Sequence, residues 1–231
     1  MKQLALDLGL APEPTLEDYL PAGNAHAVQH LRAWLAQGAA RAAEPIYLWG
    51  PPGCGKTHLL RALHGALAAQ GEAAGWLDAA TPAGTPFAGD WRAVFMDDVQ
   101  AYDEARQHTA FNWFVNAAAP EGGAALPVIA AGNAPPVDLP LRDDLRTRLA
   151  WGHIFELQHL PEADMRRALQ RAAHARGLRL PDALTDYVLA RHARDLSSLM
   201  ALLERLDRYA LELGRAATIP LFKAMLQTLE E

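Results

Sequence analysis

The segment Gly50-Pro51-Pro52-Gly53-Cys54-Gly55-Lys56-Thr57 constrains the fold of this chain more than any other stretch. It matches the pattern G-x-x-x-x-G-K-[ST], in which the glycines let the backbone curl and point N–H groups at bound phosphates. The Lys56 ammonium can reach the terminal phosphates, and the Thr57 hydroxyl can ligate Mg²⁺. Such a loop joins a buried strand to a helix, so it predicts an α/β fold with a site for ATP or ADP. The next residue, His58, is included in the expected nucleotide contacts.

The residues around this loop fit the expected strand and helix. The apolar run 46–49 precedes it, and leucines at helical spacing follow it. Helices are also predicted over 15–44, which begins with a Thr-Leu-Glu-Asp capping pattern, and over 103–118. Four further apolar runs read as strands: 75–78, 93–97, 127–131 and 154–157. Strands that alternate with helices predict a five-stranded, mostly parallel sheet covered on both faces.

The pattern changes near residue 160. Helices are predicted with no strand between them, over 161–176, 181–193, 195–214 and 218–229. We therefore divide the chain into an extended tail at 1–14, an α/β nucleotide-binding domain at 15–160 and an α-helical domain at 161–231.

A second acidic element follows the predicted strand at 93–97. In Val94-Phe95-Met96-Asp97-Asp98 an apolar strand ends in two carboxylates, which is the Walker B arrangement. Asp97 is expected to hold the Mg²⁺ shell, and Asp98 to orient or deprotonate an attacking water. The alternative is a solvated strand end, since acidic residues often follow strands.

Composition limits the classes of function. The net charge is −6 and the pI about 5.8, which argues against nucleic acid as the main partner. The one cysteine, Cys54, excludes an intramolecular disulfide, and no His/Asn pattern supports it as a nucleophile. With no signal-peptide pattern and no membrane-length apolar run, we expect a soluble cytoplasmic protein without a membrane partner. His26 and His30 have metal-binding spacing but no third ligand nearby, which favours packing.

The order of these motifs resembles that of AAA+ ATPases. In that family a strand after Walker B ends in a polar sensor, here Asn133 in Val128-Ile129-Ala130-Ala131-Gly132-Asn133. An arginine that completes a neighbouring subunit's site comes next, and Arg148 is the candidate. A lid helix then carries a second sensor, for which Arg194 is the candidate. The alternative for each arginine is a surface charge or an ion-pair partner.

Within AAA+ proteins, the chain resembles DnaA over residues 15–229. The resemblance rests on Asp97-Asp98-Val99-Gln100 and on Arg148-Leu149-Ala150-Trp151-Gly152. Two departures matter. The chain ends soon after the lid, which leaves no room for DnaA's helix-turn-helix domain, and the loop at 79–91 is shorter than the DnaA insertion that contacts single-stranded DNA. We therefore expect little direct DNA binding.

The N-terminal tail resembles a sliding-clamp motif, Q-L-x-L-x-L, in Gln3-Leu4-Ala5-Leu6-Asp7-Leu8. Leu4, Leu6 and Leu8 can fill an apolar groove while Gln3 forms hydrogen bonds at its rim. Asp7 stands where proline is common in such motifs. An N-terminal strand or a frayed tail is the alternative reading.

Together these features resemble the Hda family, the regulatory inactivators of DnaA. The resemblance implies a clamp-bound regulator that stimulates hydrolysis of DnaA-bound ATP to give inactive DnaA–ADP. It also implies bound ADP or ATP with Mg²⁺ and a homo-oligomer, in the simplest case a dimer. Turnover of its own nucleotide stays open. The alternatives are a helicase loader of the DnaC type and a non-hydrolysing adaptor on the clamp.

Overall fold

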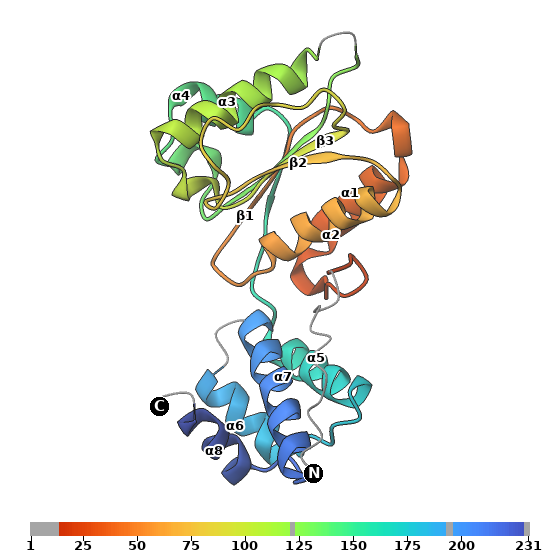
Figure 1. Cartoon of the computed structure of the whole chain (residues 1–231), viewed down its shortest axis with the longest axis vertical. Helices are drawn as coiled ribbons and strands as arrows, with labels where there is room; N and C mark the ends of the chain where they lie inside the picture. Colours follow the sequence, from red (N-terminus) through yellow and green to blue (C-terminus); the bar gives the residue numbers. More distant parts are fainter. Residues whose placement is uncertain (1–13, 121–122, 193–195, 229–231) are drawn as a thin grey trace.

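The computed structural model describes residues 14–120, 123–192 and 196–228. An α/β part built around a five-stranded sheet is followed by a lid of packed helices, as Figure 1 shows. This confirms the predicted fold class. Within these residues, no helix is both long and apolar enough to cross a membrane.

The sheet brings the predicted motifs to one edge. Its strands are β1 (Ile46–Trp49), β2 (Ala74–Leu77), β3 (Ala93–Met96), β4 (Val128–Gly132) and β5 (His153–Glu156). All neighbouring pairs are parallel, in the order β2-β3-β4-β1-β5. The carboxyl ends of β1, β4 and β3 are therefore adjacent, and ligands bind at such edges in open α/β sheets.

Helices cover both faces of the sheet. α1 (Ala25–Ala36) and α2 (Lys56–Ala69) lie on one face, and α3 (Glu104–Ala118) and α4 (Asp143–Leu149) on the other (Figure 1). Side chains of a strand alternate between faces. Ile46 and Leu48 of β1 accordingly pack with α1 and α2, whereas Tyr47 packs with α3 and α4. Four short 3₁₀ helices join these elements: η1 (Ala22–Asn24), η2 (Gly38–Ala40), η3 (Val99–Ala101) and η4 (Pro136–Asp138).

The predicted helix over 15–44 is wrong at both ends. The Thr15 hydroxyl donates to the Asp18 carboxylate at 2.7 Å, and the Asp18 N–H donates back to that hydroxyl at 3.3 Å, so the capping pattern closes a turn. Pro21 follows, and α1 begins only at Ala25. The helix α4 was not predicted, because seven residues with four charges lack an apolar period.

The lid consists of α5 (Glu162–Ala175), α6 (Asp182–His192), α7 (Leu196–Leu213) and α8 (Ile219–Gln227). These helices share one apolar core, in which Leu199 and Phe222 are almost fully buried. Leu213, at the end of α7, is 48% exposed. Leu199, Leu203 and Leu206 of the same helix are buried, whereas Leu211 is 75% exposed.

The loop at 79–91 lies against α3. The Trp113 indole donates to the Thr85 carbonyl at 2.9 Å, and the Gly84 N–H donates to the Thr109 hydroxyl at 2.9 Å. The rings of Trp91 and Trp113 are 4.6 Å apart. The indole rings therefore serve to fasten the loop to the sheet domain.

Candidate functional site

The backbone of the P-loop takes a form that only glycine allows. Gly50, Gly53 and Gly55 have φ angles of 153°, 79° and 98°. A side chain at Gly50 would collide with the Leu157 carbonyl oxygen, and one at Gly55 with the Tyr19 ring. The glycine spacing thus serves both the left-handed backbone and the close approach of neighbouring segments.

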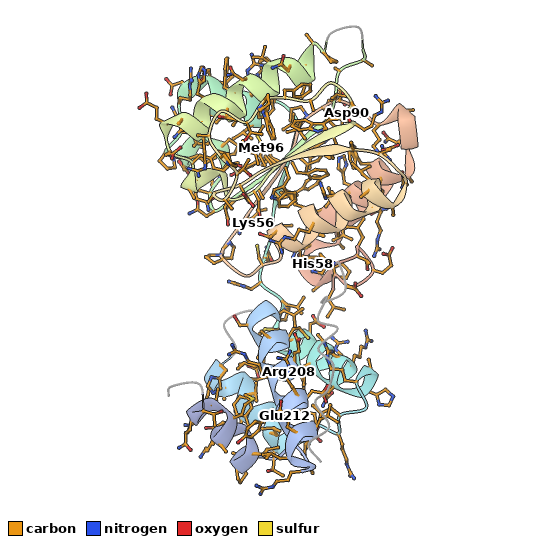
Figure 2. All side chains as sticks on the ribbon, in the orientation of Figure 1. Lys56, His58, Asp90, Met96, Arg208 and Glu212 are labelled. Atoms are coloured by element: carbon orange, nitrogen blue, oxygen red, sulfur yellow. The ribbon has the colours of Figure 1, made fainter. Side chains whose placement is uncertain are left out.

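Lys56 is the first residue of α2, and only 7% of it is exposed. Its ammonium donates to the carbonyls of Gly50 at 2.8 Å and Pro51 at 3.0 Å. The two carbonyls satisfy hydrogen bonds of the buried ammonium group, but within the described residues it forms no ion pair with a carboxylate. Its positive charge therefore remains available to an anion. Figure 2 shows Lys56 and His58 at the end of the α/β part that faces the lid.

Cys54 and His58 belong to the supporting structure of the loop. Burial raises the pKa of the Cys54 thiol, and the nearby Lys56 opposes this only in part, so the thiol stays protonated. An inert thiol agrees with a variable loop position rather than a nucleophile. The His58 Nε2 lies 3.0 Å from the Thr15 carbonyl oxygen, and its ring is 5.8 Å from that of Tyr19.

Asp97 and Thr57 meet beside the loop. Asp97 follows β3, is 5% exposed and has a side-chain hydrogen bond with Thr57. Burial raises the pKa of its carboxyl group, the Thr57 and Asp98 N–H hydrogen bonds oppose that rise, and the Asp98 charge adds to it. Asp98 is exposed and has a left-handed backbone, with φ at 49°. Oxygen ligands held together in this way suit a hard divalent cation.

Gln100 joins the acidic pair to the end of β4. Its amide donates to the Asp98 carboxylate at 3.1 Å and accepts from the Asn133 N–H at 3.1 Å. The structure therefore brings Asp97, Asp98 and Asn133 to one edge of the sheet. Sequence reasoning did not single out Gln100 as a site residue, although it is the last residue of the Asp-Asp-Val-Gln stretch.

Arg148 lies apart from the P-loop, on α4. Its guanidinium lies over the ring of Phe111 at 5.0 Å and over that of Trp151 at 5.6 Å. Nearby Arg142 and Arg146 form ion pairs with acidic residues, but Arg148 forms none within the described part of the chain. We call Phe111, Arg148 and Trp151 the Arg148 cluster. Trp151 is 67% exposed, so the cluster faces solvent.

Several predicted residues lie outside the described residues. These are Arg194, the second sensor candidate, and the tail residues Gln3, Leu4, Leu6 and Leu8.

The histidine pair does not gather a metal-ligand set. In the parts of the chain that the structure describes, no group of three or more His, Cys, Asp or Glu residues could hold a metal ion. The His30 ring instead lies 4.2 Å from that of His153 and 5.1 Å from that of Phe155.

A surface cavity of about 830 Å³ lies away from the P-loop, between the 79–91 loop and α3. Its lining includes Phe87, His108, Asn112 and Arg142. It has no glycine-rich turn at a helix start, so its size does not make it the phosphate site.

The fold and the P-loop together define an AAA+-type P-loop protein. A family model for the bacterial DnaA ATPase domain matches residues 10–74, and a model for the Hda lid domain matches residues 162–226. This chain belongs to the Hda/DnaA-like family of AAA+ proteins.

Solved structures share its fold. Domain III of Thermotoga maritima DnaA has a TM-score of 0.76 at 17% identity, covering 95% of this chain and 98% of that one. AMPPCP-bound DnaA from Aquifex aeolicus has a TM-score of 0.70 at 23% identity, covering 89% and 68%. The Thermotoga maritima RuvB branch-migration motor has a TM-score of 0.63 at 17% identity, covering 90% and 70%.

Proposed function

We propose that this chain is an Hda-type regulator that binds ADP or ATP and stimulates hydrolysis of the ATP bound to DnaA. The observation that carries the proposal is the Hda-type lid at 162–226, joined in one chain to a DnaA-like P-loop domain. The exposed Arg148 cluster and the clamp-like tail motif add to it. A cytoplasmic location follows from this role.

The P-loop residues fit a nucleoside diphosphate. Gly50, Gly53 and Gly55 leave no side chain in the cradle, and the Lys56 ammonium can exchange its carbonyl partners for phosphate oxygens. A solved DnaA relative is described with AMPPCP, a nucleotide analogue, which supports the same ligand class here. Arg194, if it acts as the second sensor, would add a charge from the lid.

Mg²⁺ fits the Thr57–Asp97 pair. Asp97 is a carboxylate whose ionised form is disfavoured by burial, and a bound cation would offset that cost. When bound, Mg²⁺ neutralises charge on the phosphates. Asp98, held to Asn133 through Gln100, is placed to orient a water. If the chain hydrolyses its own nucleotide, the reaction would depend on Asp98, Gln100 and Asn133.

Arg148 is suited to act on a partner's nucleotide. A guanidinium held by aromatic rings is preorganised and keeps its donors available for phosphate oxygens. Inserted beside a DnaA-bound ATP, Arg148 would stabilise the charge that develops on the transferring phosphoryl group. The hydrolysis product would be DnaA–ADP, the inactive form of the initiator.

The tail would localise this activity. Gln3, Leu4, Leu6 and Leu8 would bind the sliding clamp on DNA, so that the regulator acts where replication has begun. Direct DNA contact is minor in this scheme, in keeping with the net charge of −6. A homodimer is the assembly that we propose for the resting protein.

The decisive experiment measures ATP hydrolysis by DnaA with DNA-loaded clamp and this protein. Arg148→Ala should lower the stimulated rate by about 10³-fold or more, the scale typical of an arginine finger. Arg92→Ala, an exposed arginine in the loop before β3, is the matched control and should leave the rate unchanged.

Two further readouts separate the steps. Arg148→Ala should still bind ADP and the clamp as the unaltered protein does. Removal of residues 1–8 should abolish clamp binding and leave ADP binding unchanged. Full stimulation by Arg148→Ala would refute the arginine assignment. Clamp binding that survives removal of residues 1–8 would refute the tail assignment.

A further inference from the structure

A chain of buried and partly buried hydrogen bonds links the P-loop to the segment that leads into the lid. The Tyr19 hydroxyl donates to the Cys54 carbonyl at 2.9 Å and accepts from the Asn24 amide at 2.8 Å. Asn24 then bonds the backbone of Gln158 in both directions, donating to its carbonyl at 2.9 Å and accepting from its N–H at 2.8 Å. Gln158 lies between β5 and α5.

The direction of each bond in this chain is fixed. A carboxamide has one acceptor oxygen and one donor NH₂ group, so a reversed Asn24 amide would oppose donor to donor and acceptor to acceptor at Gln158. Asn24 is 4% exposed and Tyr19 8%, so water does not replace a broken bond cheaply. Burial raises the pKa of Tyr19 to about 12, and its hydroxyl therefore remains a donor at neutral pH.

The same segment also contacts the other end of the P-loop. The Leu157 N–H donates to the Trp49 carbonyl at 2.7 Å, and the Leu157 carbonyl oxygen lies against the α-carbon of Gly50. Leu157 thus contacts the start of the loop directly. Its neighbour Gln158 is linked to the middle of the loop through Asn24 and Tyr19. A shift of this segment changes the geometry at both places.

The bond to Cys54 sets the orientation of one peptide group in the loop. In a trans peptide the carbonyl and the following N–H point in opposite directions. The Cys54 carbonyl points at Tyr19, so the Gly55 N–H points away from Tyr19. N–H groups of a glycine-rich loop are the donors that phosphates use. Loss of the Tyr19 hydroxyl frees this peptide to rotate.

We propose that Tyr19 and Asn24 are positioning residues of the nucleotide site, which hold the Cys54–Gly55 peptide ready for a nucleoside diphosphate and couple it to the segment at 157–160 before the lid. This inference rests on nucleotide binding at the P-loop and on no other part of the proposed function. It assigns a role to two residues that contact the loop from outside.

The first test is the affinity for ADP, measured by calorimetry on the full chain. Tyr19→Phe removes only the hydroxyl, and with it the bonds to Cys54 and Asn24. The lost bond to Cys54 is the one that orients the loop peptide, and its loss should raise the Kd for ADP about tenfold. Tyr102→Phe is the matched control, because its buried hydroxyl donates to the Leu77 carbonyl at 2.7 Å, outside the loop. Without ADP, Tyr102→Phe should lower the Tm about as much as Tyr19→Phe does. Its Kd for ADP should stay within about twofold of that of the unaltered protein.

The second test is hydrogen exchange with and without ADP. In the unaltered protein, ADP should slow exchange both at 50–57 and at 157–160. In Asn24→Ala, ADP should still slow exchange at 50–57 and at Leu157, which contacts the loop directly, but no longer at Gln158, an uncoupling that a general loss of stability does not produce. If Asn24→Ala fails to fold, the affinity of Tyr19→Phe decides.

The inference is overturned if Tyr19→Phe binds ADP within about twofold of the unaltered protein. It is also overturned if Tyr102→Phe loses as much affinity, or if Asn24→Ala keeps the response at Gln158. Failure of the unaltered protein to bind ADP would remove the proposed nucleotide site and this inference with it, whereas loss of DnaA or clamp activity alone would not touch it.

Discussion

Replacing Asp97 with asparagine is expected to stabilise the protein in the absence of nucleotide, although Asp97 is a proposed Mg²⁺ ligand. Only 5% of Asp97 is exposed, and burial is the main cause that raises the pKa of its carboxyl group. Hydrogen bonds from Thr57 and the Asp98 N–H, together with the charge of Arg61, lower this pKa without reversing the rise. The ionised form present at neutral pH is therefore a cost of the folded state.

The size of the effect follows from the local bonds. The asparagine oxygen can still accept from the Asp98 N–H, which lies 3.1 Å from the Asp97 oxygen. Its NH₂ can donate to the Thr57 hydroxyl, which both donates and accepts, so no bond need be lost. One unit of pKa corresponds to about 1.4 kcal/mol. A gain of about 1 kcal/mol would raise the Tm of a chain of this size by about 2–4 °C.

The assay is calorimetric unfolding of both proteins at neutral pH and near pH 4. Because the pKa of Asp97 is raised on folding, stability falls as the pH rises from the ordinary value of 3.8 through the raised value. The unaltered protein has the full cost at neutral pH and only part of it at about pH 4, whereas the variant never has it. The Tm advantage of Asp97→Asn should therefore be present at neutral pH and shrink towards pH 4.

Asp90→Asn is the control for net charge, since Asp90 is exposed and lies in the loop before β3. It should leave the Tm nearly unchanged at both pH values. A lower Tm for Asp97→Asn at neutral pH, or an advantage of equal size at both pH values, would refute the reasoning from burial.

Two other substitutions test the loop and the Arg148 cluster. Gly55→Ala forces a side chain into the Tyr19 ring at a φ of 98°, and should cost about 1–3 kcal/mol of unfolding free energy and most of the ADP affinity. Gly84→Ala, at a φ of 80° with open space around the added methyl group, should cost less and spare ADP binding. Equal losses in the two variants would show that the collision is unimportant. Phe111→Leu removes one ring beneath Arg148 and should lower stimulated DnaA hydrolysis about 2- to 5-fold without changing ADP affinity, as expected for a cation–π contact between half-buried groups. Unchanged stimulation would mean that the ring does not position Arg148.

Much of the site could be predicted because its chemistry is local. The P-loop needs its glycines, lysine and threonine at fixed spacing, and these residues lie in one continuous segment. Asp97 and Asn133 are far apart in sequence, but each follows an apolar strand, and parallel strands place their carboxyl ends on one edge. The structure confirms the fold that this reasoning predicts. The roles of the site residues stay predictions.

Other features depended on contacts that no local pattern encodes. Gln100 gains its place because η3 turns it towards both Asp98 and Asn133. The predicted helix over 15–44 failed because Thr15 and Asp18 bond each other in a turn, an alternative that short polar side chains offer the backbone. The same turn-forming region supplies Tyr19 and Asn24.

Periodicity and glycine spacing are local properties of the chain, so they suffice to predict a P-loop on a parallel sheet followed by a helical lid. The residues that support that loop are set by long-range contacts, which local patterns do not encode. Tyr19, Asn24 and Gln158 are joined by hydrogen bonds that span up to 134 positions. Such bonds form only after the sheet has brought the segment after β5 beside the loop after β1.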